Sequence, residues 1–230
     1  CFMQEYFIAT KLIGRGFVVS MKHSDIMVCD EDGETPLRRA AFAFKGLPAK
    51  IQILLDVGAD VNARAEHGVT PLHYATLGPY SNLANIQSLL SAGADIMATA
   101  IDGKTPLHLA ARGTKRPEVI LALLHAGANV MALDGDGETP IHGASRNNNP
   151  AIIRILLDFG GDVMASNAQG LTPLHIAAIE AITPKTIQTL LDAGADKTAK
   201  DKNGKSPFYY AQENEYLKFN KGHLVLKNAN

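Results

Sequence analysis

The sequence has little cysteine and no tryptophan: its 230 residues include only two cysteines, Cys1 and Cys29. Two cysteines cannot form a disulfide framework, and their spacing matches no zinc-binding pattern. Because disulfide-rich scaffolds belong to oxidising environments, a reducing compartment is the simpler expectation. We therefore expect the protein to be cytoplasmic, or to be secreted without a recognisable signal peptide.

The sequence also lacks an excess of charge of either sign and any long apolar run. Its formal net charge of -1 gives no reason to expect nucleic acid or an anionic membrane surface as a partner. No apolar run approaches the roughly 18 residues that a membrane-spanning helix needs. Lys11 and Arg15 interrupt the stretch in which the apolar core of a signal peptide would lie. The hydrophobic content of 46% is ordinary for a folded protein and argues against disorder.

An initiator methionine is absent from the first position, which Cys1 occupies. One interpretation is a truncated reading frame whose true start is Met21, and the other is a processed lipoprotein acylated at Cys1. Truncation is favoured because Met21 precedes the repeated pattern described below, whereas residues 1–20 share no feature with it. Residues 1–28 are therefore interpreted as an N-terminal segment that is either not native or disordered.

The dominant feature that is present is an internal repeat. The dipeptide Thr-Pro, or Ser-Pro in the last copy, recurs at intervals of 35, 35, 34, 33 and 34 residues. The copies begin at Thr35, Thr70, Thr105, Thr139, Thr172 and Ser206. An alanine follows five residues later, and a Leu-Leu pair and Gly-Ala-Asp, or a near variant, come later in the unit. Self-similarity at such a period is typical of a repeat architecture.

Each repeat is predicted to contain two helices joined by a turn. The first leucine of each Leu-Leu pair always lies 16 residues before the next Thr or Ser, whereas 12 to 14 residues separate the alanine from that leucine. Insertions collect in loops, so the variable part is expected to be the turn. Threonine and proline suit a helix start, and a glycine such as Gly127 suits a helix end. Asp-Gly and Asn-Gly pairs between repeats indicate tight turns.

Such short helices are not stable alone in water. Their leucines and alanines, Leu123 among them, must be buried against neighbouring repeats, so stability is roughly a sum of nearest-neighbour interfaces. The pattern changes at both ends, where Arg38 replaces histidine in the first repeat and Phe208-Tyr209 replace Leu-His in the last. No second helix with a Leu-Leu pair is expected after Ala211. These departures are typical of the polar caps that a solenoid needs.

Residues 103–111, with the sequence Gly-Lys-Thr-Pro-Leu-His-Leu-Ala-Ala, resemble the ankyrin repeat, as do residues 170–178. The ankyrin signature is Gly-x-Thr-Pro-Leu-His-x-Ala-Ala followed by Leu-Leu-x-x-Gly-Ala-Asp. The resemblance covers residues 29–211 and implies an all-α solenoid of stacked helix-turn-helix units with β-hairpin loops. We expect five full repeats and a C-terminal half-repeat there, followed in residues 212–230 by the end of a capping helix and a tail. Asn-Pro or Thr-Pro before the second helix is similar to bacterial arrays of this family.

No residues indicate a metal, a cofactor or a catalytic centre. Four histidines, His73, His108, His142 and His175, occupy equivalent positions on successive repeats, and helix packing would separate them by about 8–10 Å. Zinc needs its ligands about 2 Å from one centre, so we expect each histidine to hydrogen-bond to nearby backbone and order its loop. Residues 134–138 lack the glycine and glutamate spacing of a calcium loop. Because no catalytic motif is present either, we expect that the protein is not an enzyme.

The resemblance implies that a partner protein binds to a concave face formed by the loop tips and the exposed ends of the first helices. Carried over position by position, this surface comprises Glu66, Val69, Leu77, Tyr80, Ile101, Lys104, Arg112, Glu138, Arg146, Leu171, Ile179 and Glu180. Aromatic residues and arginine are the usual anchors of binding energy, which favours Tyr80, Arg112 and Arg146. The alternative is that scattered aliphatic side chains and charged tips are ordinary solvated surface.

The expected function is therefore that of a monomeric module that binds another protein, with no role for nucleic acid or membrane. Two alternatives stay open. In the first, the chain is a targeting or regulatory segment of a larger enzyme. In the second, which the resemblance alone suggests, it is an effector secreted by a host-associated bacterium.

Overall fold

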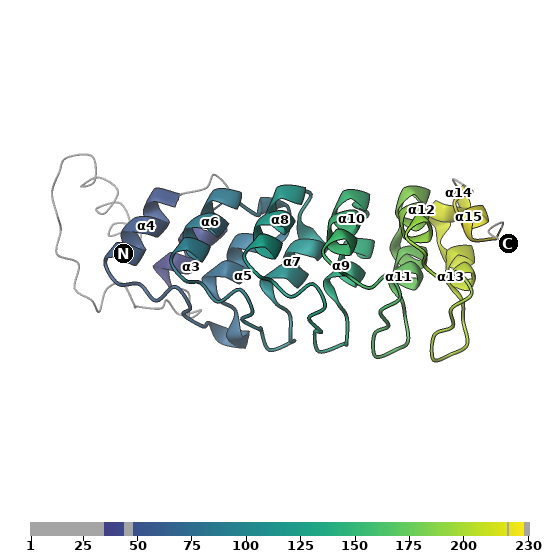
Figure 1. Cartoon of the computed structure of the whole chain (residues 1–230), viewed down its shortest axis with the longest axis horizontal. Helices are drawn as coiled ribbons and strands as arrows, with labels where there is room; N and C mark the ends of the chain where they lie inside the picture. The colour runs from purple at the N-terminus through teal and green to yellow at the C-terminus, as the bar shows by residue number, and fades with distance from the viewer. Residues whose placement is uncertain (1–34, 44–47, 220, 228–230) are drawn as a thin grey trace.

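The structure, a computed structural model, describes residues 35–43, 48–219 and 221–227. The predicted N-terminal segment, residues 1–28, and both cysteines lie outside these residues. Within them, pairs of short helices stack side by side in one elongated row (Figure 1). None of the helices in this part of the chain is long and apolar enough to span a bilayer. The predicted solenoid of stacked helical units is confirmed.

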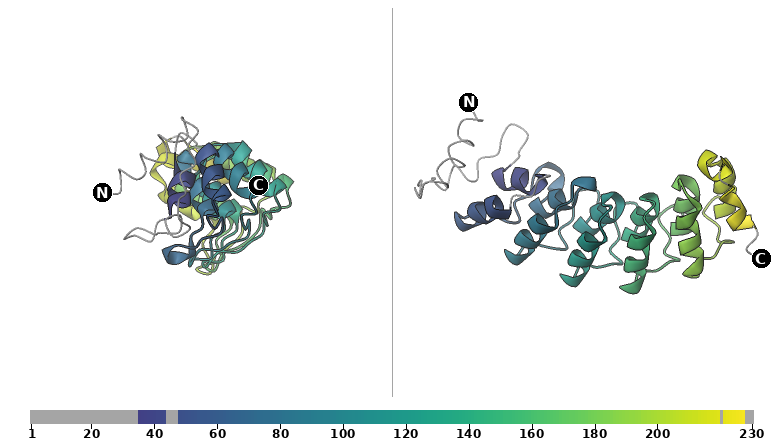
Figure 2. Two further views of the ribbon diagram at one scale, coloured as in Figure 1. Left: turned by 90° about the vertical axis from the view of Figure 1, so that its left-hand side faces the viewer. Right: turned by 90° about the horizontal axis from the view of Figure 1, so that it is seen from above.

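Each pair consists of a first helix and a second helix joined by a short turn, and a loop then leads to the next pair. The pairs are α3 (Pro36–Phe42) with α4 (Pro48–Asp56), α5 (Pro71–Thr76) with α6 (Leu83–Ser91), α7 (Pro106–Gly113) with α8 (Pro117–His125), α9 (Pro140–Arg146) with α10 (Pro150–Asp158), and α11 (Pro173–Glu180) with α12 (Pro184–Asp192). The row ends with α13 (Pro207–Glu213), α14 (Glu215–Phe219) and α15 (His223–Lys227). Short 3-10 helices, η1 (Glu66–Gly68) and η2 (Gly78–Tyr80), lie in one loop and one turn. The loops project to one side of the row, as the end-on view in Figure 2 shows.

The sequence explains where the helices begin and end. In α7, Thr105 is the N-cap and forms a capping box with His108, while proline occupies the first helical turn. The second helix α8 ends before Gly127, whose φ of 94° lies in the left-handed region that favours glycine. Beyond it, the N–H of Ala128 donates to the carbonyl oxygen of Leu123 at 3.0 Å. This bond satisfies a carbonyl group that the helix end would otherwise leave without a partner.

The core lies between the helices of neighbouring pairs, where α7 packs on α9 and α8 packs on α10. Leu107, Ala110 and Leu123 are fully buried, each with 0% of its surface exposed. Glycine allows a close approach between first helices: a Cβ atom added at Gly143 would lie 3.3 Å from the Cβ atom of Arg112 in the preceding first helix. The alternation of large aliphatic residues with alanine and glycine therefore brings the first helices into direct contact.

Buried asparagines tie helices to the preceding pair at three junctions of the row. The side-chain amide of Asn147, at the end of α9, donates to the carbonyl oxygens of Ala111 at 3.1 Å and Thr114 at 2.6 Å, at the end of α7. Asn85 and Asn214 make the same kind of contact with the first helix of an earlier pair. These bonds satisfy carbonyl groups that a helix C-terminus leaves unpaired.

The loops between pairs form tight turns, and no β-strand is present in the part of the chain that the structure describes. In the loop after α8, the N–H of Asp134 donates to the carbonyl oxygen of Glu138, and the N–H of Gly137 donates to that of Asp134, both at 3.0 Å. Neighbouring loops are linked by a backbone bond such as that from the Gly135 N–H to the Asp102 carbonyl oxygen, at 2.7 Å. The predicted β-hairpins are therefore not confirmed, because these bonds close a turn without building a ladder.

The described part of the chain after Ala211 contains no second helix with a Leu-Leu pair, as expected, but it is more helical than the capping-helix end and tail expected there. Two short helices, α14 and α15, follow α13, and α15 packs against α12 and α13. Leu217 and Leu226 are buried, with 0% and 4% of their surfaces exposed. Single leucines on two separate helices thus cover the end of the row in place of a Leu-Leu pair on one helix.

Replacing Leu123 by alanine tests the assignment of the core. The fully buried side chain should leave a cavity, so the Leu123→Ala variant is expected to lose about 2–5 kcal/mol of its free energy of unfolding, measured by urea denaturation. Leu133, 65% exposed in the following loop, supplies the matched control. Leu133→Ala should change the free energy of unfolding by less than about 0.5 kcal/mol. Equal losses in the two variants would contradict the core described here.

Candidate functional site

The predicted binding residues lie in two rows along the solenoid. One row belongs to the loops just before each first helix, and the other to the C-terminal ends of α5, α7, α9 and α11, which pack side by side. We call the two rows together the loop–helix face. Its exposed members are Glu66, Ile101, Arg112, Ile179 and Glu180, its half-buried members are Val69, Leu77, Lys104, Arg146 and Leu171, and Glu138 is buried. The side chain of Tyr80 lies outside what the structure describes.

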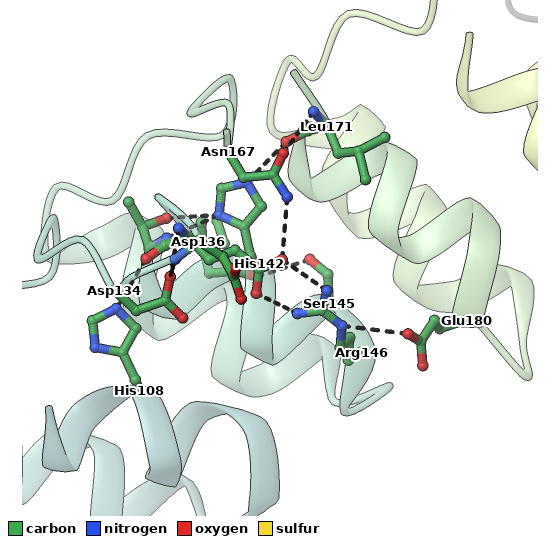
Figure 3. A network of polar contacts seen from close by, with 12 residues as sticks. His108, Asp134, Asp136, His142, Ser145, Arg146, Asn167, Leu171 and Glu180 are labelled. Carbon is green, nitrogen blue, oxygen red and sulfur yellow. Dashed lines mark hydrogen bonds and ion pairs between the residues drawn. The ribbon is translucent and has the colours of Figure 1, made fainter. Parts of the chain in front are cut away.

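A histidine in each of four repeats holds its loop against the next loop, as predicted. The N–H of Thr139 donates to Nδ1 of His142 at 3.1 Å, so Nε2 carries the proton and donates to the carbonyl oxygen of Leu171 at 3.1 Å (Figure 3). His73, His108 and His175 make the equivalent contacts with the carbonyl oxygens of Lys104, Glu138 and Lys205. Burial lowers the pKa of all four imidazoles, so each is neutral at pH 7 and orders the backbone.

A carboxylate or carboxamide braces the last three loops from within. Oδ1 of Asp134 accepts hydrogen bonds from the backbone N–H groups of Asp136 at 3.0 Å and Glu138 at 2.8 Å. Asn167 and Asp201 do the same in the next two loops. The sequence contains a signal for this role, because all three residues stand five positions before the N-cap, where the first two loops carry alanine. These braces were missing from the predicted set.

Arg146, at the end of α9, contacts the loop before its own helix and the end of α11 through its guanidinium group. Its Nη2 donates to Oε1 of Glu138 at 2.7 Å, its Nη1 donates to the other carboxylate oxygen, and its Nε donates to Glu180 at 3.3 Å (Figure 3). Oε1 of Glu138 also accepts a hydrogen bond from Asn167 at 3.2 Å. A two-pronged contact of this kind holds both planar groups in one orientation.

The structure corrects the expectation that Glu138 is an exposed carboxylate at a loop tip. The residue is only 8% exposed, and its carboxylate is already engaged by Arg146 and Asn167. Burial opposes its ionisation, but the hydrogen bonds and the positive charge of Arg146 outweigh burial and hold the pKa of Glu138 below its usual value. Sequence position alone could not reveal this pairing, because Arg146 reaches back across its own helix.

Arg112 differs from the other two cations of the loop–helix face. Lys104 pairs with Asp102 at 2.7 Å, and Arg146 pairs with the two glutamates described above. Arg112 is exposed and forms no ion pair with any residue that the structure describes. Its charge is therefore available to a group outside the chain.

The same part of the chain offers little for metal binding. Within residues 35–43, 48–219 and 221–227, no three His, Cys, Asp or Glu side chains come together in a way that could hold a metal ion. The four buried histidines each use both ring nitrogens in contacts within the protein. The polar groups of the loop–helix face thus hold the backbone in place and present a surface.

A comparison with protein-family models agrees with this architecture. A model of three ankyrin repeats matches residues 6–100 and 107–201. The chain belongs to the ankyrin-repeat family. Ankyrin repeats generally act as protein–protein interaction modules and are typically not enzymes. The match begins at residue 6, upstream of residue 29, where the repeated pattern starts. A search of curated proteins finds no match.

Acid should destabilise the ankyrin-repeat array through its buried histidines. Their pKa is lowered in the folded state, so the unfolded chain binds more protons as the pH falls below about 6.5, and stability is lost from there downward. The free energy of unfolding should be smaller at about pH 5 than at about pH 7.5. His142→Gln, which cannot titrate, should lose less between the two values than the wild type. Equal free energies at both pH values would contradict this role.

A double-mutant cycle on Arg146 and Glu138 tests their pairing. Because both groups are largely shielded from water, the coupling should be roughly 0.5–3 kcal/mol in the free energy of unfolding measured by urea denaturation. Arg146→Ala alone should cost more than the double variant with Glu138→Ala, since it leaves a buried carboxylate unpaired. The exposed pair of Lys218 and Glu215, at 3.1 Å, is the control and should show a smaller coupling. A coupling no larger than that control would mean that the contact does not order the face.

Proposed function

We propose that this ankyrin-repeat protein binds a partner protein, as a monomer, through the loop–helix face. The observation that carries the proposal is Arg112, an exposed cation that forms no ion pair with the residues that the structure describes. In the row of first-helix ends it stands between the half-buried Leu77 on one side and Arg146 and the 38%-exposed Ile179 on the other. A guanidinium in a row that also holds the apolar side chains of Leu77 and Ile179 has the composition of a binding hot spot.

The partner that suits this surface offers a carboxylate beside apolar side chains. Arg112 can bind a carboxylate through two parallel hydrogen bonds. Ile101 is 80% exposed at its loop tip, and an aliphatic group of that exposure gains free energy when a partner covers it. Lys104 and Arg146 are neutralised by their own carboxylates, so the charge of Arg112 determines which group is preferred. An acidic segment with aliphatic neighbours meets these requirements.

The bracing of the loops supports binding with little loss of conformational entropy. Asp134, Asn167 and Asp201 each fix two backbone N–H groups of their loop. The four histidines then connect the first helices α5, α7, α9 and α11 to the loops that follow. A surface ordered before binding avoids much of the cost of ordering loops on association.

The test compares two surface variants of the full chain. The first carries Leu77→Ser, Ile101→Ser, Arg112→Glu and Ile179→Ser, and it leaves Arg146 intact because that residue holds Glu138. The second is a control with Glu118→Ala, Arg154→Ala and Lys185→Ala, three exposed positions on second helices. A partner captured by the wild type should bind the first variant at least about tenfold more weakly, a loss of about 1.4 kcal/mol, and should bind the control as tightly as the wild type.

Circular dichroism and melting temperature must first show that both variants fold. If the folded first variant retains wild-type affinity, or if only the second-helix control loses affinity, the partner does not bind the loop–helix face. Arg112→Glu alone tests whether the partner supplies a carboxylate, separately from whether it binds the loop–helix face. It should weaken binding and reduce its salt dependence if the partner supplies a carboxylate.

A further inference from the structure

A row of methionines lies in the loops that lead from a second helix to the next first helix. Met97, Met131 and Met164 occupy the same position in three successive repeats. They are 38%, 37% and 37% exposed, so more than a third of each side chain is open to solvent. None of them belongs to the loop–helix face, and the proposed function makes no use of them.

Each of these thioethers is joined to the next repeat by a hydrogen bond. Sδ of Met97 accepts from the backbone N–H of Asn129 at 3.4 Å, and Sδ of Met131 accepts from that of Asp162 at 3.3 Å. Sδ of Met164 accepts from the N–H of Asp196 at 3.1 Å. The same bond thus recurs at three consecutive junctions between repeats.

The bonds between repeats connect with bonds within repeats to form one continuous chain. Oδ1 of Asn129 accepts from the backbone N–H of Met131 at 2.9 Å, and Oδ1 of Asp162 accepts from that of Met164 at 2.7 Å. Starting at Met97, contacts to sulfur and contacts to oxygen therefore alternate as far as Asp196. We call this chain of contacts the methionine ladder.

The first repeat shows what the position requires. There Asn62 stands in place of methionine, and its Oδ1 accepts from the N–H of Asp95 at 2.7 Å. An amide oxygen is a stronger acceptor than a thioether sulfur, so methionine is not needed to hold the junction. What the thioether adds is reactivity towards oxidants, because methionine is oxidised reversibly to its sulfoxide.

We propose that Met97, Met131 and Met164 are modification sites for a hydroperoxide, and that their oxidation loosens three junctions between repeats. The sulfur lone pair attacks the outer peroxide oxygen, an S–O bond forms as the O–O bond breaks, and the remaining oxygen leaves as water or an alcohol after taking a proton. Sulfur is oxidised by two electrons and the peroxide is reduced by two. No other reactant is required.

Geometry determines the consequence of this oxidation. A thioether sulfur has two lone pairs, and on each of these sulfurs one of them faces an N–H group 3.1–3.4 Å away. Oxygen added at the other lone pair leaves the sulfur a poorer acceptor, and oxygen added at this one comes between the sulfur and the nitrogen. A sulfoxide oxygen bonded to the same N–H would need about 2.7–3.2 Å to the nitrogen for itself, so the sulfur must withdraw or the side chain must turn away. Either change opens the junction, and because each repeat contacts only its neighbours, the loss falls on those three interfaces.

The experiment treats the full chain with hydrogen peroxide and follows mass, amide exchange and melting temperature. Peptide mass spectrometry should show one added oxygen atom on each of Met97, Met131 and Met164. Hydrogen exchange at the backbone amides of Asn129, Asp162 and Asp196 should become faster, and the melting temperature should fall by several degrees. The amide of Asp95, held by Asn62, is the internal control and should keep its exchange rate.

The matched variant replaces all three methionines by asparagine, the residue that the first repeat carries. This variant should fold, and peroxide should leave its melting temperature unchanged even though Met3, Met21 and Met27 remain. Treatment of the oxidised wild type with a methionine sulfoxide reductase should restore the original melting temperature.

Three results would overturn the proposal. The three methionines could resist peroxide while others in the chain react. They could be oxidised with no change in the amide exchange of Asn129, Asp162 and Asp196. The asparagine variant could lose as much thermal stability in peroxide as the wild type does, which would place the effect elsewhere.

Discussion

Burial between neighbouring repeats is the interaction on which the rest of this ankyrin-repeat structure depends. Helices of five to nine residues cannot hold themselves together in water, so each one is stable only between its neighbours. Fully buried residues such as Leu107, Leu123 and Ile152 lie at these contacts. The loops, the ion pairs and the exposed surface are all placed by that stacking, because no other core exists in the described part of the chain.

Stacking of this kind removes polar backbone groups from water, and side chains at regular positions of the repeat form hydrogen bonds with them. Every junction brings helix ends and loop carbonyl groups out of water, where an unpaired group is costly. Asn147 satisfies carbonyl groups at the end of the preceding first helix, and His142 satisfies one in the following loop. Close packing of the repeats thus requires these polar residues, and the same residues hold the loop–helix face in shape.

Much of the fold could be predicted because each position of the repeat has one physical task. Thr-Pro marks helix starts, and glycine marks the ends of second helices, since both act through local backbone geometry. The role of His142 was also predictable, because a residue spaced at the repeat period meets the same surroundings each time. The β-hairpins expected from the resemblance are not confirmed in the described residues, since the backbone hydrogen bonds within each loop close a turn without building a ladder.

The features that were not predicted depend on contacts that the repeat pattern does not encode. Glu138 looked like an exposed loop residue, and its burial follows from Arg146 in the same repeat and Asn167 in the next. The helices α14 and α15 escaped prediction because Leu217 and Leu226 belong to no Leu-Leu pair. The binding residues themselves were inferred from the resemblance, and their role is a matter for the capture experiment.

The single backbone bonds between neighbouring loops have a mechanical consequence. Loop joins loop through bonds such as Ala168 N–H to the Asp136 carbonyl oxygen, at 2.9 Å, and Lys202 N–H to that of Gln169, at 3.0 Å. Any bending of the solenoid must stretch one edge and compress the other. An edge joined by such bonds and by a few side-chain contacts resists bending less than the close-packed helices do, so small rotations at each junction add up along the row. The solenoid can therefore change its curvature to fit an object, while the shape of each repeat stays the same.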